Sequence, residues 1–102
     1  MKLHILREAE DELSEAIQYY EDIAPGLGIR LKHQVKQEIY WIENNYDLQS
    51  VRRKGYRRLN CKSFPYYIAY FVKDAEIFIV AIANASRRPE YWIKRSRPST
   101  SS

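Results

Sequence analysis

Basic side chains gather in two short windows of this 102-residue chain. Ten of its seventeen lysine and arginine residues lie there: Arg52, Arg53, Lys54, Arg57 and Arg58, then Arg87, Arg88, Lys94, Arg95 and Arg97. A guanidinium group binds phosphate or carboxylate through two parallel hydrogen bonds. The windows therefore predict a surface for RNA, DNA or an acidic protein segment, unless these charges only protect an exposed strand edge from aggregation.

The second window also holds two aromatic side chains, Tyr91 and Trp92. Pro89 restricts the residue before it to extended geometry. This is expected to end the strand and to place Arg87 and Arg88 at its C-terminal end. An indole directly after a strand usually closes a hydrophobic layer, so packing in the core or against a partner is favoured for Trp92 over base stacking. Tyr91 could stack on a base, contact a peptide or cover the core.

Acid-base and metal chemistry find little support in the residue types. The two histidines, His4 and His33, lie far in sequence from both basic windows, so the commonest acid-base side chain is missing there. The carboxylates of the first predicted helix are Glu8, Asp11, Glu12 and Glu15. Their spacing puts them on the solvated side, where we expect no chemistry. Cys61 has no neighbours at metal-ligand spacing, and we expect neither metal nor cofactor.

Hydrophobic periodicity predicts the first elements that position these residues. Leu3 to Ile5 alternates apolar and polar residues, as a short strand does. Apolar residues then repeat at helical spacing from Ala9 to Tyr20 and from Leu31 to Tyr46. Pro25 and Gly26 separate the two runs and predict a turn. The result is an antiparallel helix hairpin.

The later part of the chain is rich in Tyr, Phe, Ile and Val. This composition predicts strands over residues 54–61, 64–72 and 77–84. In the first of them, Lys54, Tyr56 and Arg58 would share one face of the sheet. Arg57 and Leu59 would share the other face, so only part of the first basic window can meet one ligand.

The element order β-α-α-β-β-β indicates an α+β fold. The helix hairpin should pack on one face of a mainly antiparallel sheet, giving two layers. We expect a single domain over residues 1–97 and a disordered tail over residues 98–102, which are Pro, Ser and Thr. The sequence has no apolar run of the length that a membrane span needs and no signal-peptide pattern, so a cytoplasmic protein is expected.

Charge is divided along the chain. Residues 7–47 carry ten acidic and four basic side chains, a net charge of −6, whereas residues 48–97 carry three acidic and twelve basic ones, a net +9. The basic half is the candidate for an anionic partner.

Three segments, taken with this element order, resemble the ParE/RelE superfamily. They are Glu10 to Tyr20 with the following Pro25 to Gly28, then Phe64 to Tyr70, and then Ala81 to Asn84 continuing through Arg87 to Trp92. The similarity extends from Met1 to Arg95. It implies the toxin of a type II toxin-antitoxin system, of the plasmid stabilisation protein family.

The resemblance also implies partners and site residues. A cognate antitoxin would form a hetero-oligomer with the toxin, wrap it with an extended or helical segment, and cover its working surface. An acidic, partly disordered antitoxin would match the basic sheet in charge. Antitoxin contacts are expected at Tyr19, Tyr20, Tyr66, Tyr70 and Trp92.

Two targets remain open within the superfamily. ParE-like members poison DNA gyrase and have no catalytic site of their own; the target-binding residues here would be Arg87, Arg88, Tyr91, Trp92, Lys94 and Arg95. RelE-like members cut messenger RNA in the ribosome; the catalytic candidates here would be Lys54, Arg57, Arg58, Arg87 and Tyr91. A lysine or tyrosine acting as a base would need a pKa lowered by nearby cations.

The helix hairpin and its twin tyrosines, Tyr19 and Tyr20, favour the ParE branch. Asn84 stands where relatives often have histidine, so a mechanism that uses this histidine is absent from the chain. A third possibility is a non-toxic module that binds nucleic acid or only the antitoxin.

Overall fold

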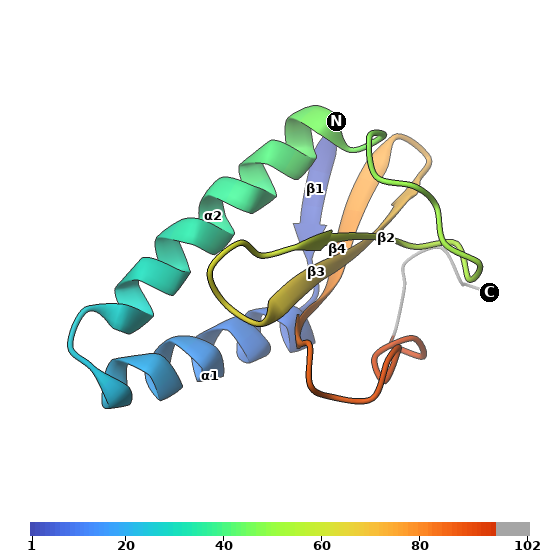
Figure 1. Ribbon diagram of the computed structural model, residues 1–102. Helices are drawn as coiled ribbons and strands as arrows, with labels where there is room; N and C mark the ends of the chain where they lie inside the picture. Colours follow the sequence, from blue (N-terminus) through green and yellow to red (C-terminus); the bar gives the residue numbers. More distant parts are fainter. Residues whose placement is uncertain (96–102) are drawn as a thin grey trace.

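The computed structural model describes residues 1–95 (Figure 1). Its elements are β1 (Lys2–Ile5), α1 (Arg7–Ile23), α2 (Leu27–Asn45), β2 (Arg57–Asn60), β3 (Tyr66–Lys73) and β4 (Glu76–Asn84). This order confirms the predicted β-α-α-β-β-β arrangement. The tail predicted over residues 98–102 lies outside the described residues.

The four strands form one mixed sheet in the order β1-β4-β3-β2. β1 runs parallel to β4, and the pairs β3–β4 and β2–β3 are antiparallel. β2 begins three residues later than predicted, because Gly55 lies in a turn with a φ of 90° and its N–H donates to Arg52 O at 2.8 Å. Lys54 therefore belongs to this turn and not to a strand.

The helix hairpin is held tightly at its tip, where the chain turns from α1 into α2. Gly26 has a φ of 90°, a conformation that costs other residues more than glycine. The Glu21 carboxylate accepts hydrogen bonds from the N–H groups of Gly26 at 2.7 Å and Gly28 at 2.9 Å, which satisfies the start of α2. Gly28 also allows close approach of the helices, because a Cβ there would lie 2.2 Å from Ile17 O.

Apolar side chains are buried on both faces of the sheet. The helix hairpin covers one face, as predicted (Figure 1), and the main core there includes Leu31, Val35 and Ile42 of α2. On the other face a second core forms around Tyr56 and Trp92, from the loop before β2 and the segment after β4. The prediction of two layers is therefore right for the helix side, and it omitted this second, irregular cover.

Candidate functional site

The edge of β4 is completed by side chains where its neighbouring strand ends. β1 pairs with β4 only as far as Ile79, so the next residues of β4 have no strand beside them on that side. Glu12 Oε1 accepts the Ile82 N–H at 2.9 Å. Arg95 Nη1 donates to the Val80 carbonyl at 3.0 Å. Two charged side chains thus take the place of a strand partner.

Glu12 and Arg95 also bind each other, as a bidentate pair. Arg95 Nη1 lies 2.9 Å from Glu12 Oε1, and Nη2 lies 2.8 Å from Oε2. The side chains are 14% and 18% exposed, so water screens the pair less than at an open surface. The hydrogen bonds that Arg95 donates to Glu12 raise the pKa of Arg95. The pair joins α1 to the segment after β4, residues 85–95, which we call the C-terminal segment.

Tyr91 is the third member of this cluster, because its hydroxyl donates a hydrogen bond to Glu12 Oε2. Burial raises the pKa of Tyr91, and the hydrogen bond to Glu12 raises it further, while Arg95 and Arg87 lower it less. A tyrosine that acts as a base needs the opposite shift. The proposed role of Tyr91 in moving protons is therefore not supported by its surroundings.

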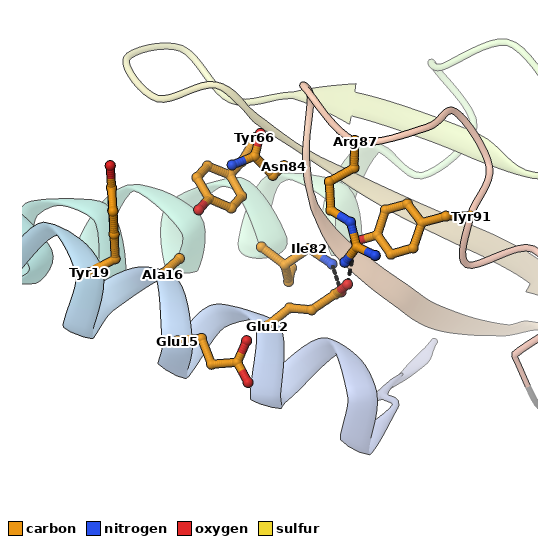
Figure 2. Close-up of a pocket in the computed structure, with 9 residues that line it drawn as sticks. All are labelled: Glu12, Glu15, Ala16, Tyr19, Tyr66, Ile82, Asn84, Arg87 and Tyr91. Atoms are coloured by element: carbon orange, nitrogen blue, oxygen red, sulfur yellow. Dashed lines mark hydrogen bonds between the residues drawn. The ribbon is translucent and has the colours of Figure 1, made fainter.

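Beside this cluster lies a pocket of about 300 Å³ between α1 and the segment after β4, shown in Figure 2. Its floor contains the buried Ala16 and Ile82. Arg87 lines it and lies with its guanidinium carbon 3.9 Å from the centre of the Tyr91 ring. Within residues 1–95 the Arg87 side chain makes no ion pair or hydrogen bond. The pocket therefore presents a cation whose in-plane donors are unused.

The pocket brings together residues that the sequence assigned to two different partners. Tyr19 and Tyr66, expected to contact an antitoxin, line it with Arg87 and Tyr91, expected to contact a target. Tyr19 is 60% exposed. Tyr20 lies beside Tyr19 and is only partly exposed, since it packs against the ring of Phe64.

Two residues expected to contact a partner are instead buried. Trp92 is 1% exposed, and its Nε1–H donates to Tyr67 Oη at 2.8 Å. Tyr70 is 0% exposed, and its hydroxyl donates to Tyr46 O at 2.9 Å. Of the two kinds of packing expected for Trp92, in the core or against a partner, the structure shows packing in the core. In this conformation neither side chain is available to touch another protein, because Tyr70 belongs to the helix-side core and Trp92 to the second core.

The first basic window divides between the faces as alternation predicted. Tyr56 belongs to the second core, and the Arg58 guanidinium carbon lies 3.8 Å from the centre of the Tyr67 ring on the same face. Leu59 packs with the helix-side core, and Arg57 Nη1 donates to Gln49 O at 2.6 Å. Arg57 is thus separated from the other candidate catalytic residues.

Lys54 joins the two basic windows through a carboxylate. Its Nζ lies 3.0 Å from Glu90 Oε1, and the Tyr56 hydroxyl donates to Glu90 Oε2 at 2.8 Å. The bond from Lys54, followed by that from Tyr56, lowers the pKa of Glu90. Arg88 and Lys94 are exposed on the segment that Glu90 helps to hold.

Asn84 fixes the turn that follows β4. Its Oδ1 accepts hydrogen bonds from the Ser86 N–H at 2.9 Å and the Ser86 hydroxyl at 2.7 Å. The position where relatives often have histidine therefore carries a side chain engaged in local structure.

Residues 1–95 contain no group of three His, Cys, Asp or Glu side chains that could hold a metal ion. No helix in this part of the chain is both long and apolar enough to cross a membrane.

Glu12 is the site residue that the sequence analysis missed, since it was placed on the solvated side of its helix. One signal was present. Glu12 lies between Ala9 and Ala16, three residues after one and four before the other, at the border of the apolar stripe. What could not be read from spacing is that Tyr91 and Arg95 return to this border.

Comparison with known proteins gives a consistent result. The family model described as "ParE toxin of type II toxin-antitoxin system, parDE" matches residues 3–89. The protein named Toxin ParE2, from Mycobacterium tuberculosis strains CDC 1551 / Oshkosh and ATCC 25618 / H37Rv, is 32% identical over 92 residues. In both strains the match covers 86% of this chain and 85% of the relative.

A solved structure shares the fold. The chain titled "Chromosomal ParDE TA system from P. aeruginosa" superposes with a TM-score of 0.74 at 22% sequence identity. The superposition covers 82% of this chain and 95% of that one. The matched family region ends at residue 89, so Tyr91 and Arg95 of the Glu12 cluster lie beyond it.

Proposed function

This chain belongs to the ParE toxin family of type II toxin-antitoxin systems, and we propose that it arrests bacterial growth by inhibiting DNA gyrase. The family and its ParDE structural neighbour also indicate an antitoxin partner. In our proposal, a cognate antitoxin forms a hetero-oligomer with the chain and keeps it inactive. Because gyrase acts on the chromosome, the place of action would be the cytoplasm.

One observation carries the choice of gyrase over messenger RNA. The two side chains that could move a proton in RNA cleavage, Lys54 and Tyr91, are both bound to carboxylates, of Glu90 and Glu12. Cleavage by the ribose 2′-hydroxyl needs a base and an acid near the phosphate. An inhibitor that only binds a protein needs neither, so this arrangement supports a ParE-like mode without catalysis.

The target-binding surface in this proposal is the segment after β4. Arg87, Arg88 and Lys94 are exposed there, with Tyr91 and Arg95 partly exposed beside them and Trp92 beneath. The antitoxin would contact the adjoining tyrosines of α1 and β3, namely Tyr19, Tyr20 and Tyr66. Two residues of each set line the pocket of Figure 2, Tyr19 and Tyr66 from the first and Arg87 and Tyr91 from the second, so one bound antitoxin segment could cover part of the target surface.

Induced expression in a bacterial host tests the proposal. Growth, the DNA-damage response and the integrity of translated messages are followed together after induction. We expect growth arrest with a damage response and intact messages. Arg87→Ala should relieve the arrest. The matched control is Arg30→Ala, which removes a charge from the exposed side of α2 and should leave the arrest unchanged.

The other outcomes identify the alternatives. Arrest with codon-periodic cuts in translated messages would replace gyrase by ribosome-dependent RNA cleavage. Undisturbed growth, with the chain shown to accumulate in folded form, would contradict toxicity and favour a module that binds only its antitoxin or nucleic acid.

A further inference from the structure

Two arginines lie near the border of α1 and the C-terminal segment, and one of them, Arg95, binds the Glu12 carboxylate. Arg95 occupies both oxygens of Glu12, at 2.9 and 2.8 Å, and Glu12 also accepts bonds from Ile82 N–H and the Tyr91 hydroxyl. The hydrogen-bonding capacity of Glu12 is therefore used within the chain. Arg87, on the pocket side, keeps an unpaired positive charge among the described residues.

The ring of Tyr91 determines where this charge lies. Arg87 stacks on one face of the ring, at 3.9 Å, while the hydroxyl at the end of the ring is bound by Glu12. Figure 2 shows Glu12 reaching from α1 to the sheet, beneath Arg87 and Tyr91. Stacking covers the flat face of a guanidinium and leaves its edge free for two in-plane hydrogen bonds.

The free edge of the Arg87 guanidinium and the apolar floor beneath it favour a carboxylate from a protein as the group that Arg87 binds, although the exposed carboxylate of Glu15 also lines the pocket. The pocket floor, Ala16 and Ile82, is buried and apolar, so an ion pair formed above it is less screened than one in open water. A volume of about 300 Å³ holds an aspartate or glutamate side chain together with an apolar neighbour against Tyr19 or Tyr66.

We infer that Glu12 is a positioning residue, which holds Tyr91 so that Arg87 presents its guanidinium to a carboxylate of the target protein. The inference rests on the proposed function, since it assigns a chemical partner to one residue of the target-binding surface. It gives a role to a helix carboxylate that lies 83 residues from its arginine partner.

Inhibition of purified DNA gyrase by the purified chain tests this inference through a double-mutant cycle. The variants are Glu12→Gln, Arg87→Ala and the two combined, with Glu8→Gln as the matched control on the exposed side of α1. We expect Glu12→Gln to raise the concentration for half-inhibition about tenfold, and Arg87→Ala at least as much. The double variant should be no weaker than Arg87→Ala alone, because Glu12 acts through Arg87. Glu8→Gln should stay within about twofold of the unmodified chain.

The cycle separates positioning from a purely structural role. If Glu12 only stabilised the fold, its effect on inhibition would multiply with that of Arg87→Ala, and urea midpoints would account for the loss. Multiplied effects, or full inhibition by Glu12→Gln, would overturn the inference. Arg87→Lys tests whether Arg87 binds a carboxylate of the target, because lysine keeps the positive charge but lacks the two parallel N–H donors of the guanidinium. Full inhibition by this variant would overturn the assignment of a target carboxylate.

A failure of the proposed function is distinguishable from a failure of the inference. If the unmodified, folded chain does not inhibit gyrase, the gyrase proposal is wrong, and the assignment of a target carboxylate falls with it. Positioning by Glu12 is then decided by backbone amide exchange. Compared with the unmodified chain, exchange across residues 86–95 should be faster in Glu12→Gln and unchanged in Glu8→Gln. Equal exchange rates in these three proteins would contradict positioning by Glu12.

Discussion

Glu12 is one of four carboxylates spaced along α1, and among the described residues it alone of these four accepts hydrogen bonds from the sheet and from the C-terminal segment. Helical spacing groups the four together, since it records only neighbours three or four residues apart. The contacts that distinguish Glu12 come from residues about eighty positions later, and local patterns carry no information on them. The arginines were recognised from their type, whereas the carboxylate that organises them required the folded chain.

Alkaline unfolding should reveal the bond between Tyr91 and Glu12. The pKa of Tyr91 is raised in the folded chain, so the folded state holds this proton more tightly than the unfolded state. Stability from this proton is complete below the ordinary tyrosine pKa of about 10 and is lost as pH rises through the folded value. Urea unfolding between about pH 8 and 11 should therefore show a shallower decline of stability for Tyr91→Phe.

Tyr40→Phe is the control, because Tyr40 is 69% exposed. Its decline should match that of the unmodified chain, to which Tyr66 and Tyr70, whose pKa values burial also raises, contribute as well. Identical slopes for all three proteins would show that Tyr91 is not held by Glu12.

The elements themselves were largely predictable, and their ends were less so. Periodicity located both helices and the first strand, and the content of Tyr, Phe, Ile and Val located the three later strands. In β4 composition was the better guide, because this strand is buried on both faces. The start of β2 was placed too early, since Lys54 and Tyr56 fit the alternation although Gly55 turns the chain between them. The second core was missed for a different reason. An irregular segment has no period, and although the position of Trp92 after a strand predicted packing, nothing local shows which face of the sheet it covers.

Trp92 should hold the C-terminal segment on the sheet. Its ring lies edge-on to Tyr56 with centroids 4.6 Å apart, and it is 1% exposed. Trp92→Ala should lower the free energy of unfolding by about 3–5 kcal/mol, measured by urea titration, because a large buried side chain is lost. Tyr40→Ala, on the exposed face of α2, should change it by less than ~0.5 kcal/mol. Similar small losses for both variants would mean that the segment is not packed as described.

The close approach of the two helices should depend on Gly28. A Cβ at this position would lie 2.2 Å from Ile17 O, so Gly28→Ala must push the helices apart. We expect a loss of about 1–3 kcal/mol in the free energy of unfolding, the usual effect of overpacking. Helix propensity alone would make the same change stabilising. A stability equal to or above that of the unmodified chain would therefore contradict the close contact at the hairpin tip.

The whole molecule separates its charges between its layers. Both helices lie within residues 7–47, which carry the net −6, while β2 and the C-terminal segment lie in the part that carries the net +9. The sequence revealed this division and predicted that alternation would split the first basic window. It did not predict that Tyr19 and Tyr66 would share a pocket with Arg87, because that depends on the path of the chain after β4 ends at Asn84.

The most direct test of the central claim is the supercoiling of relaxed plasmid by purified DNA gyrase and ATP in the presence of the purified chain. We predict that supercoiling falls as the chain is added, that broken, linear plasmid accumulates, and that the cognate antitoxin restores supercoiling. Full supercoiling at every concentration of a folded chain that still arrests growth would contradict gyrase as the target.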